Sequence, residues 1–235
     1  MKKPVVWITI CTILLLLVVF WYLKTSLWLE RLLVFGQMPV QGKSWNTEVE
    51  KFSSLYPGDD ADCFFLGDSH MEQCEWQELF LNIRCANRGI GGETTKGLLL
   101  RLHSLPPKGK NRFVFLQTGV NDLIDEESSE KILMRYGMLL DTLLKRNFRP
   151  VPTLVFPVRY LKHVNARLPD LNTRINDLAK KRACRIISIN DTIREGNRLS
   201  AEFSADGIHL NTKGYRIWAE EIKRLLQSPP DSCCQ

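Results

Sequence analysis

The chain has 235 residues, of which 44% are apolar and 25% are charged, and this balance fits one globular domain of ordinary size with an appendage. Its net charge is +6, but no nucleic-acid-binding module is recognisable, so we expect no nucleic-acid partner. The seven cysteines form neither a C-x-x-C pair nor a Cys/His cluster with zinc spacing, so we expect no metal and no cofactor.

The first element is an apolar segment, residues 4–23, that carries no charge. At ~1.5 Å rise per residue a helix of this length crosses a hydrocarbon core of ~30 Å, which predicts an uncleaved anchor over residues 1–24 that binds membrane lipid. Trp21, Tyr22 and Lys24 end the segment, as interfacial residues do. The alternatives are a cleavable signal peptide, whose apolar region would be only ~7–15 residues long, and a buried core helix.

The orientation of this anchor is weakly indicated. Lys2 and Lys3 precede the span, while Lys24 and Arg31 follow it, so the positive-inside bias is small. It favours a cytoplasmic N-terminus and a single-pass protein whose globular domain lies outside the cytoplasm, in a periplasmic or extracellular space.

Residues 25–57 are expected to form a juxtamembrane helix (27–35) followed by a Gly- and Pro-containing linker. The globular domain is then expected over residues 58–228, with a disordered tail at 229–235. In an oxidising compartment Cys74 and Cys85 are one candidate disulfide pair.

Strand and helix patterns alternate five times along this domain. The strands are apolar along their length, which is typical of a parallel sheet covered on both faces, so we expect a three-layer α/β/α domain with a parallel five-stranded sheet. The predicted strands are 62–67, 84–89, 112–119, 151–158 and 184–190, and the predicted helices are 72–82, 94–103, 127–146, 168–182 and one that starts near Thr212 as its N-cap.

Four short motifs follow strands of this predicted sheet. Ligands of such sheets bind beyond the carboxyl ends of the strands, so these loops are the expected location of a site. The motifs are GDSH (67–70), NRGIGG (87–92), GVND (119–122) and DGIH (206–209).

Ser69 has two interpretations. A serine before a helix is usually an N-cap, but a serine with an adjacent base is a nucleophile. The next residue, His70, is a poor candidate for that base because successive side chains diverge, so we expect it to pack or to line the rim of the pocket.

His209 is the better candidate for the base. Asp206 lies three residues earlier, and Gly207 permits the chain to fold so that the carboxylate meets the imidazole. The carboxylate would hold one tautomer and leave the other ring nitrogen to face Ser69. A lone D-x-x-H pair also occurs by chance in solvated loops.

Gly92 and Asn121 are candidate donors to an oxyanion. Gly92 can present its N–H group without a side chain, and Asn121 carries an amide at a strand end. Taken singly, GIGG is equally well a tight turn and Asn121 a turn-forming residue.

Together the four motifs resemble the blocks of the SGNH (GDSL-type) hydrolase superfamily, in the same order. NRGIGGETTKGLLLRL and DGIHLNTKGYRIWAEEI are especially similar to platelet-activating-factor acetylhydrolase catalytic subunits and bacterial GDSL-type acylhydrolases. The resemblance implies a flavodoxin-like sheet, a triad of Ser69, Asp206 and His209, and an oxyanion hole made by the Ser69 N–H, Gly92 and Asn121. The family usually has Leu where this chain has His70.

These features predict a membrane-anchored serine esterase that cleaves an ester or thioester of a lipid or an O-acylated glycan through an acyl-enzyme. An O-acyltransferase with the same site and a non-catalytic binding domain on the same fold are the alternatives. Basic residues are concentrated over 145–198; a solvated face is the default interpretation, and attraction to anionic head groups or acidic glycans is the functional one.

Overall fold

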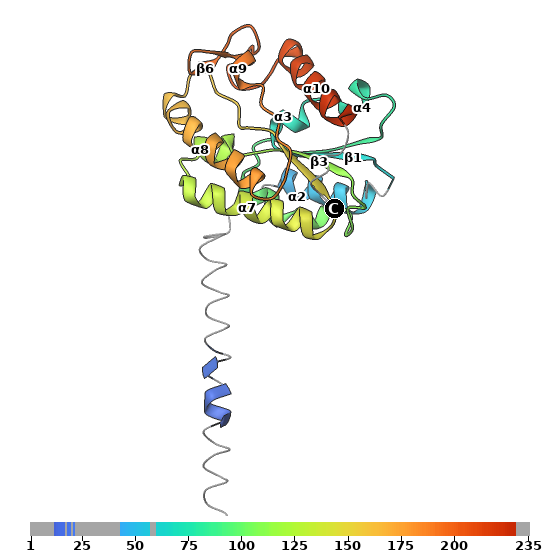
Figure 1. Ribbon diagram of the computed structural model, residues 1–235, viewed down its shortest axis with the longest axis vertical. Coiled ribbons are helices and arrows are strands. Elements are labelled where there is room, and N and C mark those ends of the chain that lie inside the picture. The colour runs from blue at the N-terminus through green and yellow to red at the C-terminus, as the bar shows by residue number, and fades with distance from the viewer. Residues whose placement is uncertain (1–11, 17, 20, 22–42, 57–59, 229–235) are drawn as a thin grey trace, which may run out of the picture. The chain divides into compact units, whose positions relative to one another are not determined.

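The computed structural model describes residues 12–16, 18–19, 21, 43–56 and 60–228 (Figure 1). The chain divides into two compact units, Met1–Val40 and Gln41–Gln235. In the first unit residues 12–16, 18, 19 and 21 are helical, and most of the predicted anchor, the predicted helix 27–35 and the tail 229–235 lie outside the described residues. Among the residues that are described, no helix has both the length and the apolar character needed to cross a membrane.

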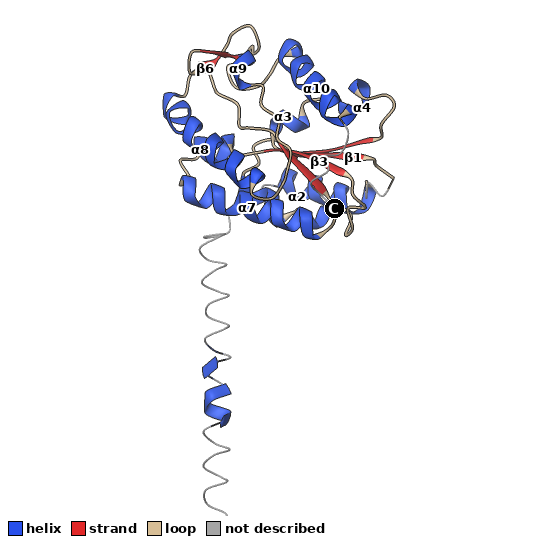
Figure 2. Cartoon of the chain, viewed as in Figure 1, coloured by secondary structure: helices blue, strands red, loops and turns tan. Residues whose placement is uncertain are grey.

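The second unit is built on a four-stranded parallel sheet with the order β2-β1-β3-β4 (Figure 2). Gly67 at the end of β1 pairs with Gly89 on β2 and with Gln117 on β3. The carboxyl ends of these three strands therefore lie at one edge of the sheet, which brings together the loops that carry the first three motifs. The strands are β1 Cys63–Gly67, β2 Cys85–Gly89, β3 Phe113–Gln117 and β4 Arg149–Pro152.

Helices cover both faces of the sheet, which confirms the predicted three-layer α/β/α arrangement (Figure 1). Alternate residues of β1 point to opposite faces: Phe64 packs in the core with α7 and α8, and Phe65 packs in the core with α4 and α10. The helices are α3 Ser69–Glu72, α4 Trp76–Leu79, α5 Thr95–Leu100, the 3-10 helix η2 Leu102–Ser104, α6 Val120–Ile124, α7 Ser129–Lys145, α8 Lys162–Lys180, α9 Asn190–Ile193 and α10 Thr212–Gln227, and a two-stranded ribbon is formed by β5 Arg194–Glu195 and β6 Arg198–Leu199.

The predicted fifth strand, 184–190, was wrong as a full strand. It makes only a parallel bridge between Ile187 and Thr153, with hydrogen bonds from Leu154 N–H to the Ile187 carbonyl at 2.9 Å and from Ile187 N–H to the Pro152 carbonyl at 2.8 Å. Pro150 and Pro152 face this side of β4 and have no N–H to donate. The ladder therefore cannot extend along β4.

Three predicted helices also differ from the structure. The helix predicted over 168–182 begins earlier, at Lys162, and ends at Lys180. The segment 72–82 holds only the short helix α4, and α3 ends at Glu72, because the Asn87 amide donates to the carbonyls of Met71, Glu72 and Cys74, the groups that would otherwise continue a helix. The N-cap of α10 is not Thr212 but Asn211, whose side chain accepts from two backbone N–H groups.

The candidate disulfide between Cys74 and Cys85 is not formed. Within the described residues, Cys63, Cys74, Cys85 and Cys184 are not joined in disulfide bonds. Cys85 instead lies beside its register partner Cys63, with the two sulfur atoms 3.4 Å apart.

Part of the expected linker is helical and packs on the sheet domain. Residues Lys43–Glu50 form α2 and Lys51–Leu55 form the π-helix η1, so the compact unit begins before residue 58. The indole N–H of Trp45 donates to Glu93 at 2.8 Å, and the guanidinium of Arg88 lies 4.9 Å from the centre of the Phe52 ring.

Glu93 and Arg101 form an ion pair whose side chains are both fully buried. Arg101 Nε donates to Glu93 at 2.6 Å, and its terminal nitrogen also donates to the carbonyls of Arg88 and Gly67 at 2.7 and 3.3 Å. Burial raises the pKa of Glu93, and the charge and hydrogen bonds of Arg101 act against that rise. The pair therefore joins α5 to the ends of β1 and β2.

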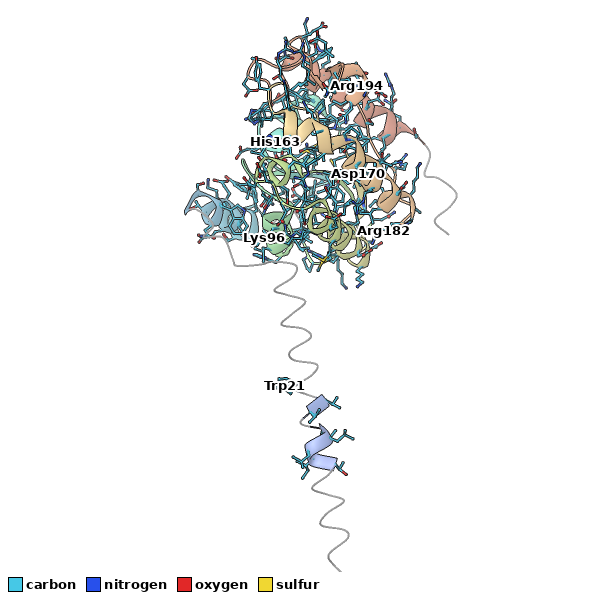
Figure 3. All side chains as sticks on the ribbon, turned by 90° about the vertical axis from the view of Figure 1, so that its left-hand side faces the viewer. Trp21, Lys96, His163, Asp170, Arg182 and Arg194 are labelled. Carbon is cyan, nitrogen blue, oxygen red and sulfur yellow. The ribbon has the colours of Figure 1, made fainter. Side chains whose placement is uncertain are left out.

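Several arginines of the stretch 145–198 form ion pairs with acidic neighbours on the surface. Arg182 lies 2.7 Å from Asp141, and Arg194 lies 2.7 Å from Asp191 (Figure 3 labels both arginines). This pairing favours the interpretation of the stretch as a solvated face.

Replacing Arg101 with Met should lower the free energy of unfolding by about 3–5 kcal/mol, because a buried carboxylate loses its cation. Urea denaturation of the full-length protein measures the loss. Arg174→Met is the matched control: its pairs with Glu130 and Asp170 are both 3.4 Å long and partly exposed, and their loss should cost less than about 1 kcal/mol. Similar losses in both variants would contradict the structural role of the buried pair.

Candidate active site

Ser69 is the first residue of α3 and follows β1 at the carboxyl edge of the sheet. The N-cap is the preceding residue, Asp68, whose carboxylate accepts a hydrogen bond from the backbone N–H of His70 at 3.0 Å. The capping role that a serine often fills is thus taken by Asp68. The half-buried hydroxyl of Ser69 lies 2.9 Å from Nε2 of His209 instead.

His209 lies in the loop before α10, and its two ring nitrogens face different partners. Nε2 faces Ser69, and Nδ1 lies 2.6 Å from a carboxylate oxygen of Asp206. A carboxylate only accepts hydrogen bonds, so Nδ1 is the donor and Nε2 of the neutral ring can accept the proton of the serine hydroxyl. The structure thus brings Ser69, His209 and Asp206 into one hydrogen-bonded chain, although Ser69 and His209 are 140 residues apart in the sequence.

The environment of Asp206 keeps it ionised. Burial raises the pKa of its carboxyl, but hydrogen bonds from the His209 ring and from the backbone N–H groups of Ile208 and His209 outweigh that effect and hold the pKa well below its usual range. Both backbone nitrogens lie 2.8 Å from Oδ1. Asp206 is therefore a carboxylate at neutral and mildly acidic pH and can stabilise an imidazolium.

The turn between the carboxylate and the imidazole depends on Gly207. Its φ of +84° lies in the left-handed region that side chains disfavour, and a Cβ there would lie 2.6 Å from the Tyr160 ring. The Gly207 N–H donates to Ser204 Oγ at 2.8 Å, and its carbonyl accepts from the Arg159 N–H at 2.7 Å. The loop is therefore tied down on two sides.

Gly92 lies in the loop after β2, and Asn121 is the second residue of α6, which follows β3. Gly92 has a φ of +72° in a turn closed by a hydrogen bond from Glu93 N–H to the Ile90 carbonyl at 3.3 Å, and glycine is favoured at this position of a type II turn. The Asn121 amide donates to the Glu93 carbonyl at 2.9 Å, and an NH₂ group has a second hydrogen for another acceptor. Glu93 thus joins the turn of Gly92 to the start of α6, at the edge of the sheet that also carries Ser69.

Asp122, the residue after Asn121, helps to hold α6 in place. It is fully buried and accepts hydrogen bonds from the backbone N–H of Thr95 at 2.8 Å and from the Thr95 hydroxyl at 2.5 Å. Burial raises the pKa of Asp122 to about 6, although the Thr95 hydrogen bonds and the charge of Arg135 lower it. These hydrogen bonds join α6, which carries Asn121, to the start of α5.

Of the two positions expected for His70, packing in the interior or lining a pocket rim, the structure shows the first, because its side chain is fully buried. Sequence reasoning also missed Asn87, Glu93, Arg101 and Asp122, which hold the loops in place. Asn87 and Asp122 stand within the quoted motifs, but a turn-forming residue and a buried hydrogen-bonding residue look the same in a sequence. Arg101 gives no sequence signal, since a single arginine in a helix is usually exposed.

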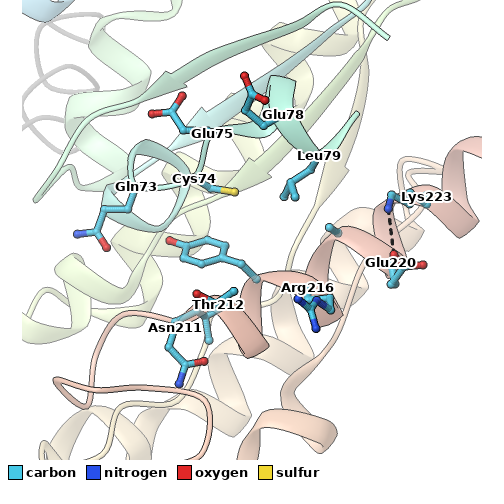
Figure 4. Close-up of a pocket in the computed structure, with 13 residues that line it drawn as sticks. Gln73, Cys74, Glu75, Glu78, Leu79, Asn211, Thr212, Arg216, Glu220 and Lys223 are labelled. Carbon is cyan, nitrogen blue, oxygen red and sulfur yellow. Dashed lines mark hydrogen bonds and ion pairs between the residues drawn. The ribbon is translucent and has the colours of Figure 1, made fainter. Parts of the chain in front are cut away.

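A cavity of about 640 Å³ lies between the α3–α4 segment and α10. Figure 4 shows Cys74 and Leu79 facing α10, where Tyr215 forms part of the wall. Ser69 and His209 are not among the residues that line it. The cavity therefore gives no measure of the group that a reactive serine would accept.

Comparisons with known proteins agree on one family. The model of the GDSL-like Lipase/Acylhydrolase family matches residues 65–217. The platelet-activating factor acetylhydrolase IB subunit alpha2 of Homo sapiens and of Bos taurus is 25% identical over 210 residues, which cover 82% of this chain and 90% of the relative.

Two solved structures show the same fold. A structure from Streptococcus pneumonia, named for platelet activating factor, has a TM-score of 0.68 and 23% identity and covers 86% of this chain and 98% of its own. A GDSL-like lipase from Bacteroides thetaiotaomicron has a TM-score of 0.66 and 18% identity, with coverage of 78% and 97%.

The raised pKa of Asp122 predicts how stability depends on pH. The folded state binds this proton more tightly than the unfolded chain does, so the contribution of Asp122 is most favourable below about pH 4 and is lost as pH rises through about 6. The difference in free energy of unfolding between wild type and Asp122→Asn should therefore shift by about 2 kcal/mol, to the disadvantage of wild type, from pH 4 to pH 7. Urea denaturation at several pH values measures it, and a difference independent of pH would contradict the prediction.

Proposed function

The chain belongs to the GDSL-like lipase/acylhydrolase family and is a hydrolase that acts on ester bonds, and from this premise we propose that Ser69 is its nucleophile, His209 its general base and Asp206 the residue that orients His209. The observation that carries the proposal is the hydrogen-bonded chain of these three side chains, with distances of 2.9 and 2.6 Å. Nucleophile, base and orienting carboxylate in hydrogen-bond reach are what acyl transfer by a serine requires.

In the first half of the reaction, Ser69 Oγ attacks the carbonyl carbon of the ester while His209 Nε2 takes the hydroxyl proton. The carbonyl oxygen becomes an oxyanion in the tetrahedral intermediate. When the intermediate collapses, the bond to the leaving alkoxide breaks, His209 returns the proton to it, and the acyl group stays on Ser69.

The oxyanion requires hydrogen-bond donors that are already in place. We assign this role to the backbone N–H groups of Ser69 and Gly92 and to the Asn121 amide. The bond from Asn121 to the Glu93 carbonyl fixes the direction of the amide before substrate binds, so little reorganisation is needed when charge develops.

In the second half, water replaces the alcohol. His209 takes a proton from the attacking water, the acid is released, and Ser69 recovers its proton. An O-acyltransferase would use a sugar hydroxyl in place of this water with the same residues. The third interpretation, a non-catalytic binding domain, is set aside because of the family membership.

The substrate that we propose is a small acyl ester of a lipid or an O-acylated glycan. The relatives from Homo sapiens and Bos taurus are named for acetyl hydrolysis, which makes an acetyl ester the first substrate to test. The N-terminal sequence, with its uncharged residues 4–23, supports a membrane anchor that would keep the site near lipid or envelope glycan, outside the cytoplasm.

Ser69→Ala and His209→Ala should each lower kcat on p-nitrophenyl acetate by about 10⁴-fold or more, because each removes a member of a unit that acts together. Both should abolish labelling by a fluorophosphonate, which mass spectrometry should place on Ser69 in wild type. Asn121→Ala should lower kcat by only about 10²–10³-fold, since it removes one oxyanion donor.

His163→Gln, which changes an exposed histidine, is the matched control and should keep wild-type activity. An ester series from acetate to palmitate then ranks acyl length, and product analysis with a sugar acceptor separates transfer from hydrolysis. Activity that survives in Ser69→Ala would rule out the proposed nucleophile.

The anchor has its own test. Full-length protein in membranes should remain in the pellet after alkaline carbonate extraction, whereas a chain that starts at Gln41 should be released, because only the former carries residues 4–23. Protease added to intact cells should digest the domain if it lies outside the cytoplasm. Release of the full-length chain by carbonate would rule out a spanning segment.

A further inference from the structure

His70 makes hydrogen bonds at both ends of its buried ring. Nδ1 lies 3.2 Å from Asp68 Oδ1, and Nε2 lies 3.0 Å from the backbone carbonyl oxygen of Ile208. Neither His70 nor Asp68 is exposed to solvent. A histidine placed only to fill space would leave these nitrogens without partners, at a cost that burial makes large.

The bond to Ile208 has a defined direction. A carbonyl oxygen only accepts, so Nε2 of His70 carries a hydrogen and donates it, and by the same rule Nδ1 donates to the Asp68 carboxylate. Ile208 is the residue directly before His209, and His70 directly follows Ser69. The hydrogen bond therefore joins the backbone next to the base to the side chain next to the nucleophile, in addition to the contact between Ser69 Oγ and His209 Nε2.

Neighbouring side chains fix the ring of His70 in this position. The Phe156 ring meets it edge-on, with the ring centres 5.2 Å apart. The hydroxyl of Tyr215, on α10, donates to the His70 backbone carbonyl at 2.9 Å. The start of α3 is thus joined both to the loop that carries His209 and to α10.

We propose that His70 is a positioning residue, which holds the imidazole of His209 at the distance and angle needed to take the proton of Ser69 by donating a hydrogen bond to the Ile208 carbonyl. This inference rests on the proposed function of Ser69 and His209. A leucine here would fill a similar volume but would donate nothing, so the contact depends on the imidazole.

Three replacements of His70 separate positioning from packing. Gln places an amide nitrogen near the location of Nε2 and can still donate to the Ile208 carbonyl. Asn places its amide nitrogen near the location of Nδ1 and can reach only Asp68. Leu has no hydrogen to donate to either group. We expect kcat on an acetyl ester to fall by no more than about threefold in His70→Gln and by about 10–100-fold in His70→Asn and His70→Leu. KM should stay within about twofold of wild type, because the substrate contacts are unchanged.

The full-length protein is used throughout, with His163→Gln as the control for a histidine change at the surface. If Ser69→Ala is inactive but Asn, Leu and Gln at position 70 are equally active, positioning by His70 is refuted while the proposed function stands. If Ser69→Ala is active, the proposed function itself fails.

A measurement on wild type covers the case in which the variants do not fold. In protein labelled with ¹⁵N-histidine and ¹³C-isoleucine, NMR should show a protonated Nε2 of His70 with a coupling across the hydrogen bond to the Ile208 carbonyl carbon. An unprotonated Nε2 at neutral pH would overturn the proposal, because such a nitrogen cannot donate.

Discussion

The buried ion pair between Arg101 and Glu93 is the interaction on which the site depends. Withdrawing two charges from water is costly, and it is offset here because each charged group makes several hydrogen bonds. The guanidinium binds the last carbonyl of β1, that of Gly67, and the carbonyl of Arg88 near the end of β2, and the carboxylate also accepts the Trp45 indole N–H. One pair thus fixes the strand ends from which the Ser69 and Gly92 loops start, and it holds the N-terminal helix α2 against them.

The two halves of the site are supported in different ways. The Gly92 turn and the start of α6, which carries Asn121, are attached to a buried network through Glu93. This suits donors that must not move when negative charge develops on the substrate oxygen. The proton-transfer half is more open, since the His209 and Asp206 side chains are 26% and 54% exposed. The loop that carries these two side chains is held by individual hydrogen bonds to its backbone. The partly exposed imidazole can therefore exchange protons with substrate and water.

The sequence predicted what depends on neighbouring residues and missed what depends on distant ones. Apolar runs identified β1 and β3, whereas the strand predicted over 151–158 overlaps β4 only at Val151 and Pro152. Glycine and aspartate spacing identified the loop of His209. The role of Asp68 as the cap of α3 was not visible, because aspartate and serine are equally good caps. Helix α2 was interpreted as linker, since its polar surface gives no hint that Trp45 reaches a buried carboxylate. The segment 184–190 has a strand's composition, but its pairing was decided by prolines on another strand.

Those prolines also protect the sheet against other chains. An edge strand with a regular row of free N–H and C=O groups is a template for pairing with a second molecule, which is how many aggregates begin. Pro150 and Pro152 remove the donors from the outer side of β4, and the bridge at Ile187 occupies the donor of Leu154. A newly made chain whose segment 184–190 has not yet docked therefore offers a poor edge for intermolecular strand addition.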